Sequence, residues 1–372
     1  MILLSTLCRV GASIGFSLLF VGLGGTGTAT LEKRPLQRVE GCPPTQPNTF
    51  CALSREPVGI GAMGMSPDGK LLAVANDNAA IELWDLTTWV QVKTLVGHTI
   101  GINAVTFSPD GTLLASGGRD NLIKVWMVAT GEQLLSWASH SISAVFGLDF
   151  SPDGKLLASS GCAKGNGTFL CNPGLIELWE IPGGALVHAL KGHTETVWPV
   201  AFSPDGKILA SGSFGFNNPP IFLWDVATGE VLRTLEGHRR NVNTLVFTQD
   251  GAKLASSGDT TIRIWDVQGG RELSKLQVST CCPADFVALS PDQKLWATST
   301  CGRVITLPDG HNIACVESQT QLWDVASSNL LGILTVENAT GTGNGVFTPG
   351  GKLLLVTHGN EVWAIHVGDL PN

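Results

Sequence analysis

The stretch SPDGTLLA, residues 108–115, decides the fold. Its centre, Pro-Asp-Gly, is a tight-turn sequence: the proline presets φ, the aspartate bonds to nearby backbone, and the glycine accepts a positive φ. The apolar run NAVTF, residues 103–107, precedes the turn, and LLASGG, residues 113–118, follows it. The stretch therefore predicts two antiparallel strands joined by a tight turn.

Variants of this phrase recur along the chain, seven copies in all. The copies begin at Ser66, Ser108, Ser151, Ser203, Thr248, Ser290 and Thr348. Each copy is followed by a short apolar run that contains a tryptophan: Trp84, Trp126, Trp179, Trp224, Trp265, Trp323 and Trp363. Four of these tryptophans precede an aspartate, and three copies close with Gly-His. A repeat of about 40–45 residues is typical of proteins that stack one supersecondary unit many times.

This phrasing resembles the WD-repeat family, and the resemblance covers residues 59–367. It implies an all-β fold, a seven-bladed β-propeller of four-stranded blades. A single four-stranded sheet cannot bury both of its faces, so the blades stack radially and close into a ring. The composition agrees, with 45 glycines and no run of helix-period residues after residue 30.

The resemblance also implies a hydrogen-bonded network inside a blade, made by a histidine, a serine on the second strand, an aspartate in the next turn and the tryptophan. Two sets of residues fit this pattern: His98, Ser116, Asp120 and Trp126, and His238, Ser256, Asp259 and Trp265. The other blades lack one or more members. His, Ser and Asp could instead form a catalytic triad. Because an enzyme needs one site and this pattern recurs, the repetition favours a structural role.

The N-terminal part stands apart from the repeats. Residues 1–29, with the apolar run VGASIGFSLLFVGLGG at 10–25, are typical of a secretory signal peptide cleaved after Ala29; an uncleaved anchor is the alternative. Residues 30–58 form an N-terminal segment, and residues 368–372 a short tail. The seventh copy ends at its third strand, so we expect LEKRPLQRVE, residues 31–40, to pair with it as the fourth strand and close the ring.

Two copies carry insertions between the second and third strands, and cysteines bracket both insertions. Copy three is longer by about 10 residues and copy six by about 15. Without the signal peptide eight cysteines remain, and an even number in an exported chain predicts disulfides. The expected pairs are Cys42–Cys51, Cys162–Cys171, Cys301–Cys315 and, by elimination, Cys281–Cys282. Cys281 or Cys282 could instead pair with the 301–315 loop, or both could be reduced. The absence of a CxxC motif disfavours a metal site.

Blade topology places these cysteines on the face opposite the Pro-Asp-Gly turns. In resembling proteins that face, where the central channel opens, is the usual place for partner binding. At the top of each inner strand, five residues before the Ser or Thr of the turn, the candidate partner-binding residues are Asn103, Phe146, Trp198, Asn243 and Asp285. Phe146 and Trp198 lie in adjacent blades and would form an aromatic patch, or simply plug the channel.

These features predict a non-catalytic, protein-binding or scaffolding propeller that acts outside the cytoplasm, secreted or periplasmic. We expect a monomer with a protein or peptide partner and no cofactor or metal. A net charge of −8 without basic runs argues against nucleic acid, and membrane contact would need an uncleaved anchor. One alternative is a carbohydrate-binding propeller that uses Trp198 and Phe146. A hydrolase is disfavoured, since only Asp285, Asp149 and Glu195 could supply acid–base chemistry.

Overall fold

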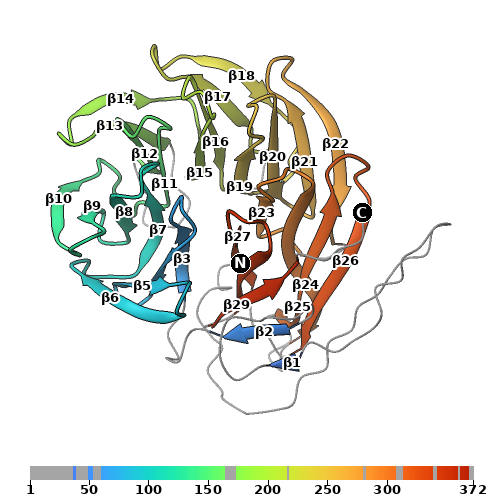
Figure 1. Cartoon of the computed structure of the whole chain (residues 1–372). Coiled ribbons are helices and arrows are strands. Elements are labelled where there is room, and N and C mark those ends of the chain that lie inside the picture. Colours follow the sequence, from blue (N-terminus) through green and yellow to red (C-terminus); the bar gives the residue numbers. More distant parts are fainter. Residues whose placement is uncertain are drawn as a thin grey trace.

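Seven β-sheets stand side by side around a central axis (Figure 1). The computed structural model describes residues 37–38, 49–52, 60–163, 173–215, 218–279, 282–306, 313–337, 342–358 and 361–367. Over these residues the chain forms strands and turns without a helix, and hence contains no helix able to cross a membrane. The all-β, seven-bladed propeller predicted from the repeats is confirmed.

The first four blades follow the chain from the axis outward. Blade 1 consists of β3 (Ile60–Met65), β4 (Leu71–Asn76), β5 (Ala80–Asp85) and β6 (Val90–Val96). Blade 2 consists of β7 (Ile102–Phe107), β8 (Leu113–Gly118), β9 (Leu122–Met127) and β10 (Gln133–Ala138). Blade 3 consists of β11 (Gly147–Phe150), β12 (Leu156–Cys162), β13 (Gly174–Glu180) and β14 (Leu186–Leu190). Blade 4 consists of β15 (Val197–Phe202), β16 (Ile208–Ser213), β17 (Ile221–Asp225) and β18 (Val231–Leu235).

The remaining blades include two that depart from this size. Blade 5 consists of β19 (Val242–Phe247), β20 (Lys253–Gly258), β21 (Thr261–Asp266) and β22 (Arg271–Gln277). Blade 6 consists of β23 (Phe286–Leu289), β24 (Leu295–Thr306), β25 (Ile313–Asp324) and β26 (Leu330–Glu337). Blade 7 consists of β27 (Thr342–Phe347), β28 (Leu353–His358), β29 (Glu361–His366) and two N-terminal strands, β2 (Thr49–Ala52) and β1 (Gln37–Arg38).

The Pro-Asp-Gly turn explains why the repeat phrase recurs. In blade 2, Ser108 Oγ donates to Asp110 Oδ1 at 2.6 Å and accepts from the backbone N–H of Leu113 at 2.9 Å. The Gly111 N–H donates to the Ser108 carbonyl at 2.8 Å, and Gly111 has a φ of 72°. Serine, aspartate and glycine therefore each supply one element of the turn. The same bonds recur in blades 1, 3, 4 and 5, with threonine in place of serine in blade 5. We call the face that carries these turns the turn face.

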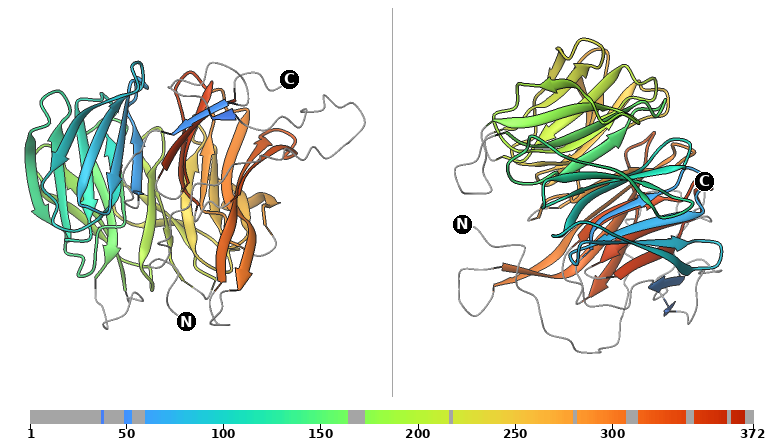
Figure 2. Two further views of the ribbon diagram at one scale, coloured as in Figure 1. Left: turned by 90° about the horizontal axis from the view of Figure 1, so that it is seen from below. Right: turned by 90° about the vertical axis from the view of Figure 1, so that its left-hand side faces the viewer.

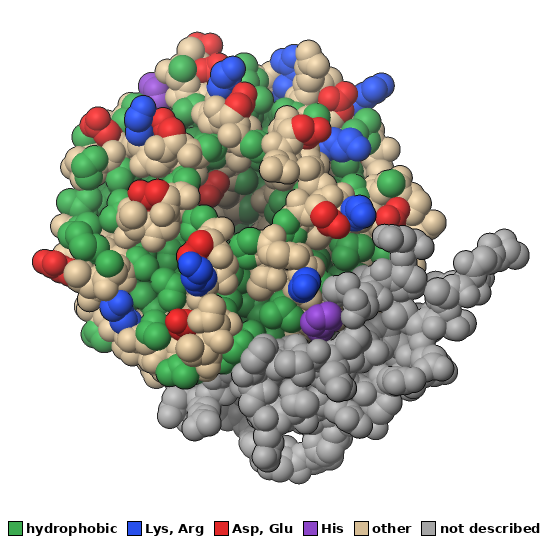
Figure 3. Space-filling view, viewed as in Figure 1, with side chains coloured by type: hydrophobic (Ala, Val, Ile, Leu, Met, Phe, Trp, Pro, Cys, Tyr) green, Lys and Arg blue, Asp and Glu red, His purple; other side chains and the backbone are tan. Residues whose placement is uncertain are grey.

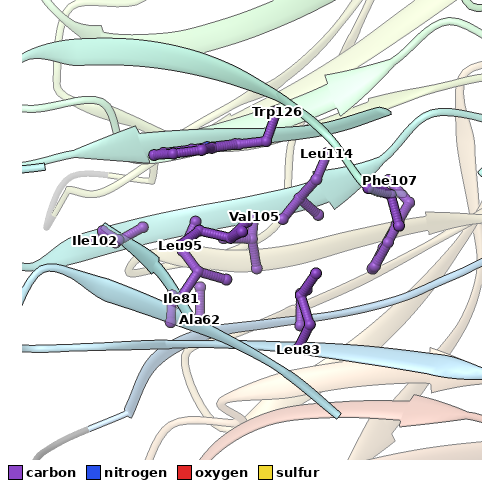
Figure 4. Packing of buried hydrophobic residues seen from close by; sticks show 12 residues of the cluster. Ala62, Ile81, Leu83, Leu95, Ile102, Val105, Phe107, Leu114 and Trp126 are labelled. Carbon is purple, nitrogen blue, oxygen red and sulfur yellow. The ribbon is translucent and has the colours of Figure 1, made fainter. Parts of the chain in front are cut away.

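The hydrophobic core is divided into clusters that lie between neighbouring blades. Figure 4 shows one of them, in which Leu83 and Leu95 of blade 1 pack against Leu114 and Trp126 of blade 2. Trp126 is almost wholly buried, as its large apolar ring system demands. Another cluster joins Leu72 of blade 1 to Leu355 and Val362 of blade 7, so the ring of blades is closed by packing.

The turn face is closed in the same way. The Gly69 turn of blade 1 lies against the turn of blade 7, where a Cβ on Gly69 would come within 2.4 Å of Pro349 Cδ. Between blades 1 and 2 the equivalent approach, from Gly111 to Pro67 Cδ, is 3.5 Å. The seam between the first and last blades is therefore the tighter of the two.

Blade 7 takes its outer strands from the N-terminal part of the chain. β2 pairs antiparallel with β29, with Phe50 opposite Ile365 and Ala52 opposite Trp363. β1 pairs parallel with β2 as a fifth strand. The prediction that residues 31–40 form the strand beside the third strand was therefore wrong, because residues 49–52 form it. The strand at 49–52 ends seven residues before β3 begins, a connection similar in length to those between the other blades.

The insertion of copy six continues the sheet and is not a separate loop. β24 and β25 each have 12 residues, and their pairing extends from Leu295 opposite Asp324 to Thr306 opposite Ile313. In Figure 2 this hairpin projects beyond the other blades. The insertion of copy three, residues 164–172, lies outside the described residues.

Candidate functional site

The described cysteines lie on the face opposite the turn face. Cys301 and Cys315 form a disulfide with a Cα–Cα distance of 5.8 Å, across the extended hairpin of blade 6. Cys162, at the end of β12, accepts a backbone hydrogen bond from Ile142, and Cys282 accepts one from Thr300 Oγ1. We call this the cysteine face.

The other predicted pairings remain predictions. Cys162 is disulfide-bonded, but its expected partner Cys171 lies outside the described residues. Cys42 and Cys281 also lie outside them, and only the backbone of Cys51 is described, within β2. Cys282 is buried.

Three aromatic side chains form a continuous stack on the cysteine face. Phe146 and Trp198 stack at a ring-centroid distance of 5.7 Å with an interplanar angle of 21°. Trp198 in turn stacks on Phe214 at 4.3 Å and 23°. All three side chains are half-buried, so part of the stack is open to solvent. We call Phe146, Trp198 and Phe214 the aromatic stack.

The sequence placed Phe146 and Trp198 together but missed Phe214. Phe214 follows β16 at the turn between the second and third strands of blade 4, and its N–H donates to the carbonyl of Thr196. Blade 2 has an Asp-containing turn at this point, SGGRD (116–120), whereas blade 4 has SGSFG (211–215). The sequence signal that could have identified Phe214 is an aromatic residue at a position where a turn residue is expected.

Two candidate partner-binding residues link neighbouring blades. Asn103 Nδ2 donates to the carbonyl of Val145 in blade 3 at 3.0 Å. Asn243 Nδ2 donates to the carbonyl of Ala284 in blade 6 at 2.9 Å. Both amides are therefore engaged in holding adjacent inner strands together.

Two carboxyl groups, on or next to inner strands, lie in surroundings that disfavour their charge. Burial raises the pKa of Asp149 to about 7, although its Oδ2 accepts a hydrogen bond from the Phe202 N–H at 2.7 Å. Burial also raises the pKa of Asp285 to about 8. In Figure 3 the centre of the ring is hollowed, and an acidic side chain is visible at the edge of this hollow.

The structure brings together the predicted network of blade 2. Ser116 Oγ lies 2.8 Å from His98 Nε2 and accepts from Trp126 Nε1 at 2.9 Å. Asp120 Oδ1 lies 2.9 Å from His98 Nδ1. Burial lowers the pKa of His98 despite the opposing effect of Asp120, so the imidazole is neutral at physiological pH.

Blade 5 has the same four residue types in a looser arrangement. Ser256 Oγ lies 2.7 Å from His238 Nε2 and 2.8 Å from Trp265 Nε1. Asp259 Oδ1 is 3.5 Å from His238 Nδ1. Burial alone would raise the pKa of Asp259, but bonds from His238, Thr261 and the backbone of Arg239 hold it well below the usual range.

Blades 3 and 4 depart from the pattern in different ways. In blade 4, His193 Nε2 lies 2.7 Å from Ser211 Oγ, and burial lowers the pKa of His193 to about 3 because no carboxylate bonds to it among the described residues. In blade 3, His140 is exposed and lies outside the blade's Trp–Ser pair. Its Nδ1 is 2.5 Å from Oε1 of Glu177, a buried carboxylate that the sequence did not single out.

Chemically, these blade networks act as internal cross-links. The imidazoles of His98, His193 and His238 are buried in their blades, and their nearest hydroxyls already accept a tryptophan N–H. A substrate could not reach these hydroxyls without disrupting the blade. Among the described residues, no cluster of three or more His, Cys, Asp and Glu side chains could hold a metal ion.

Comparison with known proteins agrees with this architecture. The family model for the WD domain, G-beta repeat, matches residues 89–127, 131–168, 184–216 and 229–266. The first and last of these segments begin with the outermost strand of one blade and end with the third strand of the next. The chain therefore contains four WD-domain repeats within a seven-bladed propeller. No curated protein matches the chain.

Proposed function

We propose that this protein is a non-catalytic binding propeller that acts outside the cytoplasm and holds a protein partner on its cysteine face. WD-repeat propellers generally bind proteins and are typically non-catalytic. The observation that carries the proposal is the aromatic stack. Aromatic residues are enriched in protein interfaces. Tryptophan is among the residues that most often carry the binding energy at their centres.

The surroundings of the aromatic stack favour a binding role over a packing role. Trp198 and Phe146 are half-buried, whereas the tryptophans that fill the spaces between blades, such as Trp126, Trp224 and Trp265, are almost completely buried. Ile142, beside Cys162 on the same face, is 56% exposed. Apolar groups that remain in contact with water are stabilised when a partner covers them.

The proposed compartment is supported by the cysteines. The Cys301–Cys315 disulfide clips a hairpin, and structural disulfides persist mainly in oxidising compartments. The leader predicted for residues 1–29 and the even number of cysteines that follow it point the same way. Alkylation of the natural protein without reductant should leave Cys301 and Cys315 unmodified. Their modification would place the protein in a reducing compartment.

The binding role is tested by comparing immobilised wild-type protein with Trp198→Ala in capture from the extracytoplasmic fraction. We expect the variant to lose a specific protein partner, with about 30-fold weaker affinity, because truncating a central tryptophan costs about 2 kcal/mol or more. Leu134→Ala is the matched control, since Leu134 is an exposed apolar residue on the outer strand β10. Equal capture by both variants would count against the proposal, as would selective binding to a glycan array.

A further inference from the structure

The inner strands that surround the channel are unbalanced in charge. β3, β7, β11, β15, β19, β23 and β27 contain Asp149 and no lysine, arginine or histidine. Asp285 stands immediately before β23, at the same repeat position as Phe146 and Trp198. Asp285 therefore lies with Phe146 and Trp198 at the end of the channel on the cysteine face, whereas Asp149 lies nearer the turn face.

Asp149 has no compensating charge on the strands that pack against it. These strands, β7, β8, β12 and β15, carry no charged residue. From the part of the chain that the structure describes, the carboxylate receives only backbone hydrogen bonds, from Phe202 and Phe150. The raised pKa of Asp149 reflects this isolation.

Asp285 is similarly isolated. The strands packed against β23 bring two basic residues, Lys253 on β20 and Arg303 on β24. Lys253 lies next to the blade-5 turn, on the turn face, and Arg303 is 3.8 Å from Glu317 in the blade-6 hairpin. Among the described residues, neither basic side chain forms an ion pair with Asp285.

Uncompensated carboxylates in a narrow, low-dielectric opening attract cations, because the protein walls concentrate their field. Aromatic faces attract cations as well, through the ring quadrupole, and tryptophan is the strongest of them. An acidic guest would be repelled by the carboxylates and by the negative faces of the rings. Arginine suits such a site better than lysine, since its guanidinium is planar, stacks on aromatic rings and is more weakly hydrated.

We propose that the partner inserts a basic side chain, arginine in preference to lysine, at the mouth of the channel between the aromatic stack and Asp285. This inference rests on the proposed protein-binding function and specifies which group of the partner is recognised. The partner is then a protein with an exposed arginine in an accessible segment, and its recognition depends on the charge and the flat shape of that side chain.

The test uses three peptides. The probes are the blocked pentapeptide acetyl-Gly-Ser-Arg-Ser-Gly-amide, its lysine counterpart and its citrulline counterpart, which keeps the shape of arginine but is neutral. Binding to the whole mature protein is measured by ligand-observed NMR and calorimetry at pH 8.5, where the carboxyls of Asp149 and Asp285 are mostly ionised. We expect millimolar binding of the arginine peptide, with at least about fivefold weaker binding of the citrulline and lysine peptides.

Variants then assign the binding to this site. Asp285→Asn and Trp198→Ala should each weaken binding of the arginine peptide at least about fivefold. Glu132→Gln, which removes one exposed negative charge from the turn between β9 and β10, should leave it unchanged. Circular dichroism melting confirms that each variant is folded.

The outcomes separate this inference from the proposed function. If the arginine and citrulline peptides bind equally, or if neither binds at 5 mM (about the weakest useful affinity), the basic-group inference is overturned. Capture of a protein partner that depends on Trp198 but not on Asp285 would also overturn it, while the proposed function would stand. Loss of arginine-peptide binding in Glu132→Gln would assign the effect to net charge and so contradict the site.

Discussion

Buried polar side chains in the blades differ in how well they are satisfied. Ser116 is fully buried, and its hydroxyl bonds to the ring nitrogens of His98 and Trp126. These two hydrogen bonds offset its desolvation. Asp149 receives backbone bonds but no opposite charge, and burial raises its pKa to about 7. The first arrangement stabilises a blade, whereas the second costs stability whenever the carboxyl is ionised.

Replacing Asp149 with asparagine should stabilise the protein at neutral and alkaline pH. In the unfolded chain the carboxyl ionises near 3.8, and in the folded protein near 7. Between these values the unfolded state releases its proton first, so the wild-type stability falls as pH rises from about 4 to about 7 and is level above. Asparagine keeps the acceptor for the Phe202 N–H and removes this loss.

The measurement is chemical denaturation of wild type and Asp149→Asn at pH 4 and pH 8. We expect a gain of at least about 1 kcal/mol in the variant at pH 8 and a much smaller gain at pH 4. A gain that is the same at both pH values would show that the carboxyl is not the cause. The matched control is Glu132→Gln, whose side chain is exposed.

Among individual side chains, the sequence predicted those that fit the repeated pattern and missed those that lie outside it. His98 and His238 were found because each has a serine and an aspartate at fixed spacing. Glu177 and Phe214 were missed, because neither belongs to the pattern of histidine, serine, aspartate and tryptophan that the repeat suggested. Their roles arise from contacts with His140 and Trp198, which the spacing of the repeat does not reveal.

Among the strands, the extended hairpin of blade 6 differs most from the repeat. β24 and β25 continue beyond the end of β23, whose last pair on this face is Phe286 opposite Ser299. Beyond Ser299 the hairpin therefore lacks the support of the inner strand. The Cys301–Cys315 disulfide joins the two strands at that level, which is where a cross-link contributes most.

The double variant Cys301→Ser/Cys315→Ser should loosen the hairpin without unfolding the propeller. A disulfide that closes a loop of this length contributes about 3 kcal/mol in the loop-entropy description. Hydrogen exchange of the backbone from 301 to 306 should become at least about tenfold faster, while β8 and β9 of blade 2 exchange at their wild-type rates. Unchanged exchange in the hairpin would mean that strand pairing alone holds it.

The strands with repeat phrasing were predictable, and those outside it were not. Cysteines at both ends of an insertion indicated a clipped segment, but nothing in CGRVITLPDGHNIAC (301–315) distinguishes a loop from continued strands. The prediction assigned the N-terminal strand to 31–40, as the only segment available to supply the missing fourth strand. The length of the connection to β3 favours residues 49–52 instead, because from β2 the chain can enter β3 through a short connection.

The ring as a whole is held by interfaces between neighbours, and one interface joins the first blade to the last. The repeat and the blade are out of phase: a repeat such as 89–127 supplies the outer strand of one blade and the inner three of the next. Each repeat thereby links two sheets covalently. At the seam between blades 1 and 7, β2 continues into β3, but hydrogen bonds to β29 hold β2 in blade 7, and the seam also relies on core packing and on the contact of Gly69 with Pro349.

Gly69→Ala should therefore cost more than Gly111→Ala. Both glycines have a positive φ, 69° and 72°, so both substitutions carry the same backbone strain of roughly 1 kcal/mol. Only at Gly69 would the new methyl group come within 2.4 Å of a neighbouring proline. We expect the free energy of unfolding to fall by about 1 kcal/mol more in Gly69→Ala than in Gly111→Ala. If urea titrations show equal losses of unfolding free energy in the two variants, the contact between Gly69 and Pro349 adjusts to the methyl group without loss of stability.

The pairing of β2 with β29 also determines how the molecule responds to mechanical force. Phe50 near the start of β2 lies opposite Ile365 near the end of β29, so the outward-leading ends of both strands are at the same end of the ladder. Tension applied through the two chain ends would load the hydrogen bonds between these strands one after another, as in a zipper, and not all together in shear. The propeller should yield first at blade 7 and at low force, with the other blades still folded.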